Sequence, residues 1–264
     1  MTDPSPRDVI NAVHETIRVT VDGPVLRLTL NRPEVLNAFD ARLLREVREV
    51  VIAAGAEPSV RAILVDHAGD RAFSAGIDVA YVKSMRGVSA REIGRELHRT
   101  FLTLRTTEIP IVCAIDGLCL GAGLEFAVSC DLMVASDRSR FGLPNIHRGI
   151  PAIVEAAILP AAIGLQGARD LAYLGQFWDA NKAERRGLLQ AVVPPEQVIS
   201  HAQTLCADLA AKSPLALSTQ KEIIHKWMTT DLESAIDFSI NTVTLNFGSP
   251  DQQEAMQAFL DKRP

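Results

Sequence analysis

The first quarter of the chain alternates between short β-rich runs and one longer stretch of helical periodicity. Residues 16–21 and 25–30 have the alternating pattern of half-buried strands, and Asp22-Gly23 between them is a strong hairpin signal. After Asp40, which we expect to be a helix N-cap, apolar residues recur at helical spacing. Residues 62–65 then predict a buried strand, so a strand-helix-strand unit with a right-handed crossover is expected.

The same alternation continues through the middle of the chain. Residues 83–104 carry apolar positions at helical spacing, which predicts an amphipathic helix lying over the sheet. Short apolar runs at 110–115 and 132–135 predict further strands, and residues 141–145 predict a loop. The first half therefore has the pattern of an α/β layer architecture.

From residue 151 onward the pattern becomes almost entirely helical. We expect only one strand there, at 191–193, among helices near 153–163, 167–175, 179–186, 195–211, 214–228 and 231–246. Helices without enough sheet to cover often pack on another subunit, so oligomerisation through this part is expected.

Composition excludes several classes of function. The chain has 264 residues with a net charge of -5, which gives no general electrostatic reason to bind nucleic acid or an anionic membrane. The N-terminus lacks the features of a secretory signal and no apolar run reaches membrane-spanning length, so a soluble, cytoplasmic protein is expected. The four cysteines show no CxxC spacing, which favours free buried thiols over disulfides or a zinc site.

The strongest candidate for chemistry is the glycine-rich stretch at residues 117–131, which follows the strand expected at 110–115. Gly121-Ala122-Gly123 falls at a predicted helix start, where free N–H groups and a positive partial charge can stabilise an anion. Glu125 stands in the first turn among apolar neighbours, where a carboxylate is partly desolvated. The alternative is that the glycines serve only close packing and that Glu125 only complements the helix dipole.

Several separated segments together resemble one family, the crotonase (enoyl-CoA hydratase/isomerase) superfamily, in both order and spacing. They are Arg32-Pro33 with Leu36-Asn37-Ala38, residues 73–78 (FSAGID), residues 120–125 (LGAGLE), Cys130-Asp131, and residues 141–144 (FGLP). The resemblance implies an α/β fold of stacked ββα turns that binds acyl-CoA in residues 1–195. It also implies a helical C-terminal region, residues 196–264, that builds homotrimers or, as dimers of trimers, homohexamers.

The same resemblance implies an acyl-CoA thioester substrate, with coenzyme A as part of that substrate and with no separate cofactor or metal. In the family two backbone N–H groups hold the thioester oxygen, and they map here onto Ala75 and Ala122. Chemistry beside a thioester passes through an enolate, whose oxygen such donors stabilise. The segments that would line coenzyme A contribute Ala75, Gly76, Ile77, Asp78 and Gly121. Lys221 is either a ligand for a coenzyme A phosphate or a solvated helix lysine.

The chain departs from the hydratase pattern at one position. Hydratases of this family use two carboxylates, one at the position of Glu125 and one at a position that is Asn145 here. An amide can hydrogen-bond water but cannot exchange a proton at neutral pH. Glu155, His147 and Asp137 are nearby candidates for a replacement acid or base.

Four functions therefore remain open from the sequence. The first is a hydratase or dehydratase with Glu125 as acid and base and Asn145 placing the water. The second is a double-bond isomerase that needs only Glu125, and the third is another enolate reaction such as thioester hydrolysis or decarboxylation. The fourth is a non-catalytic acyl-CoA binder, against which the retained Glu125 argues, because a binder gains little from a desolvated carboxylate.

Overall fold

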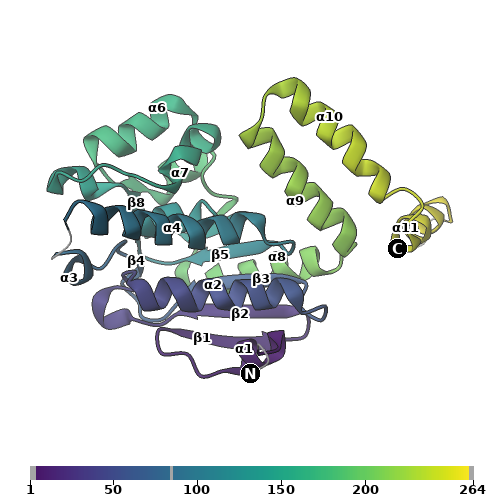
Figure 1. Cartoon of the computed structure of the whole chain (residues 1–264), viewed down its shortest axis with the longest axis horizontal. Coiled ribbons are helices and arrows are strands. Elements are labelled where there is room, and N and C mark those ends of the chain that lie inside the picture. Colours follow the sequence, from purple (N-terminus) through teal and green to yellow (C-terminus); the bar gives the residue numbers. More distant parts are fainter. Residues whose placement is uncertain (1–3, 84–85, 262–264) are drawn as a thin grey trace.

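A computed structural model describes residues 4–83 and 86–261 of the protein, and its centre is a six-stranded sheet (Figure 1). The strand order is β1-β2-β3-β5-β7-β10, with β1 and β2 antiparallel and every other pair parallel. The strands are β1 (Ile17–Asp22), β2 (Val25–Leu30), β3 (Ala62–His67), β5 (Ile111–Ile115), β7 (Leu132–Ser136) and β10 (Ala191–Val193). The hairpin, the parallel β2–β3 pair and the strands predicted at 110–115, 132–135 and 191–193 are confirmed.

A second sheet of four very short strands lies beside the first. Its order is β4-β6-β8-β9, formed by β4 (Ala72–Ser74), β6 (Leu118–Leu120), β8 (Arg140–Gly142) and β9 (Trp178–Asp179). In the chain, β4, β6 and β8 each follow a strand of the larger sheet, namely β3, β5 and β7, and a helix comes next. This repetition of two strands and a helix is the stacked ββα arrangement expected from the resemblance.

Helices cover both faces of the larger sheet. Helices α2 (Ala41–Ala56) and α4 (Val88–Thr106) pack side by side on one face, and α8 (Val198–Ala210) packs on the other (Figure 1). Along β3, Ile63 and Val65 enter the core beneath α2 and α4, whereas Ala62 and Leu64 join the smaller core beneath α8. A strand buried on both faces reads as a continuous apolar run, which explains why β3 and β5 show no alternation.

The remaining helices complete the chain and show where the sequence prediction was incomplete. They are α1 (Pro6–Asn11), α3 (Val79–Val82), α5 (Ala122–Ala127), α6 (Leu159–Leu174), α7 (Ala180–Arg185), α9 (Pro214–Thr229), α10 (Leu232–Thr242) and α11 (Pro250–Leu260). Short 3-10 turns add η1 (Pro33–Val35), η2 (Pro144–Arg148), η3 (Glu155–Ile158), η4 (Pro195–Gln197) and η5 (Val243–Leu245). The prediction of a loop at 141–145 is wrong, because β8 extends to Gly142 and η2 begins at Pro144, with only Leu143 between them.

The C-terminal helices differ in how they attach to the body. Val198, Ala202 and Cys206 of α8 are buried against the sheet, whereas α9 and α10 form an antiparallel pair that extends away from it (Figure 1). The division at residues 195 and 196 stays a prediction. Within residues 4–83 and 86–261, no helix is long and apolar enough to cross a membrane.

Asn37 anchors the loop that leads from β2 to α2, and we predict that its side chain is needed for stability. It is buried with φ +52°, its Nδ2 donates to Ala68 O at 3.0 Å and Ala72 O at 2.9 Å, and its Oδ1 accepts from Arg32 N at 2.9 Å. Asn37→Ala should lower the free energy of unfolding by roughly 3 kcal/mol, because buried partners lose their bonds and alanine disfavours this φ. Urea unfolding measures the loss. The control Asn241→Ala removes an exposed bond within α10, and an equal loss there would contradict the prediction.

Candidate active site

Two loops from different parts of the chain meet with almost no side chain between them. A Cβ placed on Gly76 would lie 2.9 Å from Leu120 O and 3.2 Å from Ala122 N, and one on Gly123 would lie 2.7 Å from Ser74 O. Neither glycine could accept a side chain without moving backbone. The segment at 74–76 and the glycine-rich turn at 121–123, which the sequence predicted to act together, are therefore in direct contact.

The glycine-rich turn ends β6 and begins α5, as predicted. Gly121 is the N-cap residue with φ +55°, a conformation that favours glycine, and its N–H donates to Gly142 O at 2.9 Å. Ala122 is the first residue of α5, so its N–H has no acceptor within the helix. Its N–H also finds no acceptor elsewhere in the described part of the chain. This amide is free to bind a ligand oxygen.

The prediction that the amide of Ala75 is the second donor is wrong. Ala75 N already donates to Leu36 O at 2.9 Å, so it has no free hydrogen. The next residues pair with Phe39, because Phe39 N donates to Gly76 O at 2.7 Å and Asp78 N donates to Phe39 O at 2.9 Å. Successive N–H groups of an extended segment point to opposite sides, so the N–H of Ile77 points away from Phe39. It has no acceptor among the residues that the structure describes.

An ion-pair network holds this donor segment in place. Arg32, at the end of β2, lies 3.1 Å from both Asp78 Oδ2 and Asp40 Oδ2, and its Nη1 donates to Ala38 O at 2.6 Å. The Asp78 carboxylate also caps α3 by accepting from Ala80 N at 2.9 Å. The Asp78 side chain is thus committed to positioning the loop, and the expected contact of its backbone with coenzyme A stays a prediction.

Glu125 lies in the first turn of α5, the helix that begins with the free amide of Ala122. Its side chain is buried, with 2% of the residue exposed, and its Oε2 has no hydrogen-bond partner in the described structure. Burial raises the pKa of Glu125 to about 7; the backbone amide of Ala156 opposes this shift, and the charge of Glu155 adds to it. A carboxyl that titrates near neutrality can both take and give a proton at physiological pH.

Asn145 stands over the same turn. A Cβ on Gly121 would lie 2.8 Å from Asn145 Oδ1, so the amide packs directly on the N-cap of α5. The side chain makes no hydrogen bond within residues 4–83 and 86–261, which leaves its polar atoms available. The Asn145 side chain therefore lies against the glycine-rich turn, and its role in placing a water stays a prediction.

The three candidates for a replacement acid are placed differently. His147 Nε2 lies 3.3 Å from Gly175 O, and Asp137 is exposed on the turn between β7 and β8. Only Glu155 is buried, and it is the group whose charge acts on Glu125. His147 and Asp137 therefore hold structural or surface positions.

The ammonium group of Lys221 is hydrogen-bonded within the chain. Its Nζ donates to Leu104 O at 3.1 Å, Ile109 O at 3.0 Å and Asp131 Oδ2 at 2.7 Å, and 10% of its side chain is exposed. All three hydrogens of the ammonium group are used, so this lysine fastens α9 to the body. The interpretation of Lys221 as a solvated helix lysine is wrong, and its role as a ligand for a coenzyme A phosphate stays a prediction.

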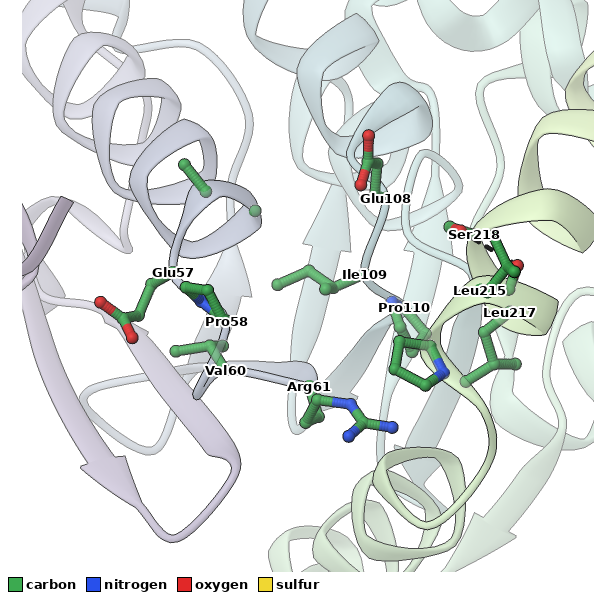
Figure 2. Close-up of a pocket in the computed structure, with 13 residues that line it drawn as sticks. Glu57, Pro58, Val60, Arg61, Glu108, Ile109, Pro110, Leu215, Leu217 and Ser218 are labelled. Atoms are coloured by element: carbon green, nitrogen blue, oxygen red, sulfur yellow. Dashed lines mark hydrogen bonds between the residues drawn. The ribbon is translucent and has the colours of Figure 1, made fainter. Parts of the chain in front are cut away.

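A hollow of about 380 Å³ lies elsewhere, at the opposite edge of the larger sheet (Figure 2). Residues 55–61, 108–110 and 214–218 surround it, and they precede β3, β5 and the body of α9. Parallel strands place their starts at one edge and their ends at the other, and the two free amides follow strand ends. The hollow is therefore separate from the candidate site.

Comparison with known proteins finds similar proteins over almost the whole chain. A family model described as Enoyl-CoA hydratase/isomerase matches residues 20–264. A crotonyl-CoA hydratase of Syntrophomonas wolfei is 31% identical over 251 residues, covering 95% of this chain and 96% of that protein. A short-chain-enoyl-CoA hydratase of Clostridium acetobutylicum is 32% identical over 243 residues, covering 92% and 93%. The crystal structure of an enoyl-CoA hydratase from Bacillus anthracis superposes with a TM-score of 0.90 at 27% identity, covering 94% and 97%.

The burial of Glu125 predicts a pH-dependent penalty on stability. Its folded pKa of about 7 lies above the ordinary value of 4.5, so the folded protein keeps a proton that the unfolded chain releases. Stability is therefore lost as the pH rises from about 4.5 through 7, and Glu125→Gln should remove this loss. At pH 8 the variant should be more stable than the parent by roughly 3 kcal/mol, with little difference at pH 4.5.

Urea unfolding across this pH range measures the effect. Glu49→Gln, which changes an exposed carboxylate on α2, is the matched control and should show no such dependence. A constant difference between Glu125→Gln and the parent from pH 4.5 to 8 would contradict the assignment.

Proposed function

Because the chain belongs to the enoyl-CoA hydratase/isomerase family, we propose that it adds water to the double bond of an enoyl-CoA thioester, or removes it, with Glu125 as acid and base. The observation that carries this proposal is one buried carboxyl with a pKa of about 7, on the short helix that begins with a free amide. The names of the relatives support hydration as the reaction.

The two free amides form the proposed oxyanion hole. We assign Ile77 N and Ala122 N as the donors to the thioester oxygen, in place of Ala75 and Ala122. Hydrogen bonds to neighbouring backbone fix the segment that carries each donor. Phe39 pairs with residues 76 and 78 beside Ile77, and Gly121 N donates to Gly142 O beside Ala122. Donors fixed in this way need no reorganisation as charge develops, and one donor is typically worth about 3 kcal/mol of barrier. The backbone at 75–78 and Gly121 is proposed to line the coenzyme A.

One acid suffices if it acts twice. The Glu125 carboxylate removes a proton from water as the water oxygen bonds to the β carbon, and the electrons of the double bond move onto the thioester oxygen. The resulting enolate collapses when Glu125 returns the proton to the α carbon, so one water is added overall. Asn145 can orient that water by hydrogen bonding without exchanging a proton.

A double-bond isomerase is the second candidate, and the amide at position 145 favours it. An isomerase moves one proton between two carbons, which Glu125 can do without an activated water. Acyl-CoA binding without turnover is separated from both by the first experiment below.

We also propose that the protein is a homotrimer or homohexamer in the cytoplasm. The projecting helices carry large exposed apolar side chains, including Trp227 with 55% and Leu232 with 72% of the residue exposed. Apolar surface of this kind is a feature of interfaces. The four cysteines are free and buried, which suits a reducing compartment.

The proposed role of Glu125 is tested with crotonyl-CoA and a 3-enoyl-CoA in heavy water. The parent should hydrate crotonyl-CoA and place deuterium at the α carbon. Glu125→Gln should lower both rates by about 10²- to 10⁴-fold, the usual contribution of general acid-base catalysis. Glu49→Gln should retain them. Binding of either thioester without deuterium uptake or turnover by the parent would show a binder and defeat the proposal.

The proposed role of Asn145 is tested by truncation. Asn145→Ala should lower kcat/KM for hydration by roughly tenfold, as expected for one lost hydrogen bond to water in the transition state. Conversion of the 3-enoyl-CoA, which needs no water, should change much less. Equal losses in the two reactions would indicate that Asn145 supports the site as a whole and does not place a water.

A further inference from the structure

A second buried carboxylate lies beside Glu125, on a different element. Glu155 begins η3, with 2% of the residue exposed, and backbone amides of residues 154–156 interact with the Glu125 carboxyl. Helix α5, which carries Glu125, and η3, which carries Glu155, are in direct contact, so the charge of Glu155 acts on Glu125. Each has one carboxyl oxygen, Oε2, that is buried and without a partner in the described structure.

Helix α4 holds Glu155 from the other side. Its Oε1 lies 2.8 Å from His98 Nδ1 and accepts from Arg105 Nη2 at 3.1 Å. His98 and Arg105 are seven residues apart, or two helical turns, so they share one face of α4. The Glu155 carboxylate can only accept hydrogen bonds, and both of these contacts are made by its Oε1.

This buried ion pair is not expected to stabilise the folded protein. Taking a carboxylate and a guanidinium out of water costs several kcal/mol, and the cost is recovered only if the remaining polar atoms are also satisfied. Here Glu155 Oε2 and Arg105 Nε are both buried without partners among residues 4–83 and 86–261. Apolar residues in these places would avoid that cost, so the charge itself needs another explanation.

We propose that Glu155, fixed by His98 and Arg105, is the second carboxylate of this site and acts through Glu125 as a positioning residue. Its fixed negative charge disfavours ionisation of Glu125, because two carboxylates in one desolvated place repel each other. The Glu125 carboxylate is then a stronger base toward water, and the proton that it takes from the water can be delivered to the α carbon. The inference rests on the proposed function, and it explains how a site with Asn145 can manage with one proton-transferring group.

The charged groups around Glu125 are few, which makes the idea testable. From η3 the facing charge is Glu155, and behind it α4 presents His98 and Arg105. From η2 the site receives the neutral Asn145. Glu155→Gln removes the negative charge and preserves the shape, so the pKa of Glu125 should fall from about 7 toward its ordinary value of 4.5.

The primary measurement does not depend on activity. The ¹³C NMR signal of the Glu125 carboxyl, assigned by its loss in Glu125→Gln, is followed against pH in the parent and in Glu155→Gln. The acid limb of the kcat/KM profile for crotonyl-CoA should move to lower pH in parallel. Glu155→Asp, which keeps the charge, should restore most of both shifts. Glu96→Gln, a carboxylate of α4 paired with Arg48 and Arg99, is the matched control and should change neither.

The outcomes separate this inference from the proposed function. An unchanged Glu125 titration in a folded Glu155→Gln protein overturns the role of Glu155, whatever the activity. A shifted titration in a protein that turns over no thioester supports the role of Glu155 and defeats the proposed function. If Glu155→Gln does not fold, the double variant Glu155→Gln with Arg105→Gln leaves no unpaired charge. It should show a smaller downward shift, because the positive charge of Arg105 is lost as well, and the absence of any downward shift would overturn the inference.

Discussion

The constraint on which the site depends is the direct contact of two backbone segments with no side chains between them. Gly76 packs on Leu120 and Ala122, and Gly123 packs on Ser74, at distances that a Cβ would violate. This contact brings a loop after β4 and the start of α5 together, so that amides far apart in the chain can face one ligand. The two contacting segments follow β4 and β6 of the smaller sheet. Because β4 and β6 pair directly, this sheet makes the contact rigid.

A rigid backbone donor pair needs only a proton-transferring group to become a catalytic site. Glu125 is positioned by the same helix that provides the Ala122 amide, so the distance between donor and acid is fixed within one turn of α5. Burial under η3 then shifts its pKa toward neutrality. In the proposed function the helix therefore provides both the acid and one donor, and the first loop provides the other donor.

Around this centre the polar side chains divide into those that hold the backbone and those that lie beside α5. Arg32, Asp78 and Lys221 belong to the first kind, since their charged atoms are committed to ion pairs and carbonyl oxygens. Asn145 and Glu155 belong to the second. The amide at position 145 is compatible with family chemistry only if one carboxyl can serve twice, and the charged environment of Glu125 is suited to that use.

The sequence by itself determined the elements whose signals are local. The Asp22-Gly23 hairpin, the helix capped by Asp40, the buried strand β5 and the start of α5 at the glycine-rich turn all follow from turn residues, caps and periodicity within short windows. The motifs also identified Glu125 and the family. Tertiary structure alone decided the rest, because it depends on partners distant in the chain. Strands of three residues are too short to show an alternating hydrophobic pattern. The pairing of residues 76–78 with Phe39 decides that Ile77, and not Ala75, has a free amide. Only the packing of α4 against η3 places Glu155 between Arg105 and Glu125, since no local pattern reports a contact across fifty residues of chain.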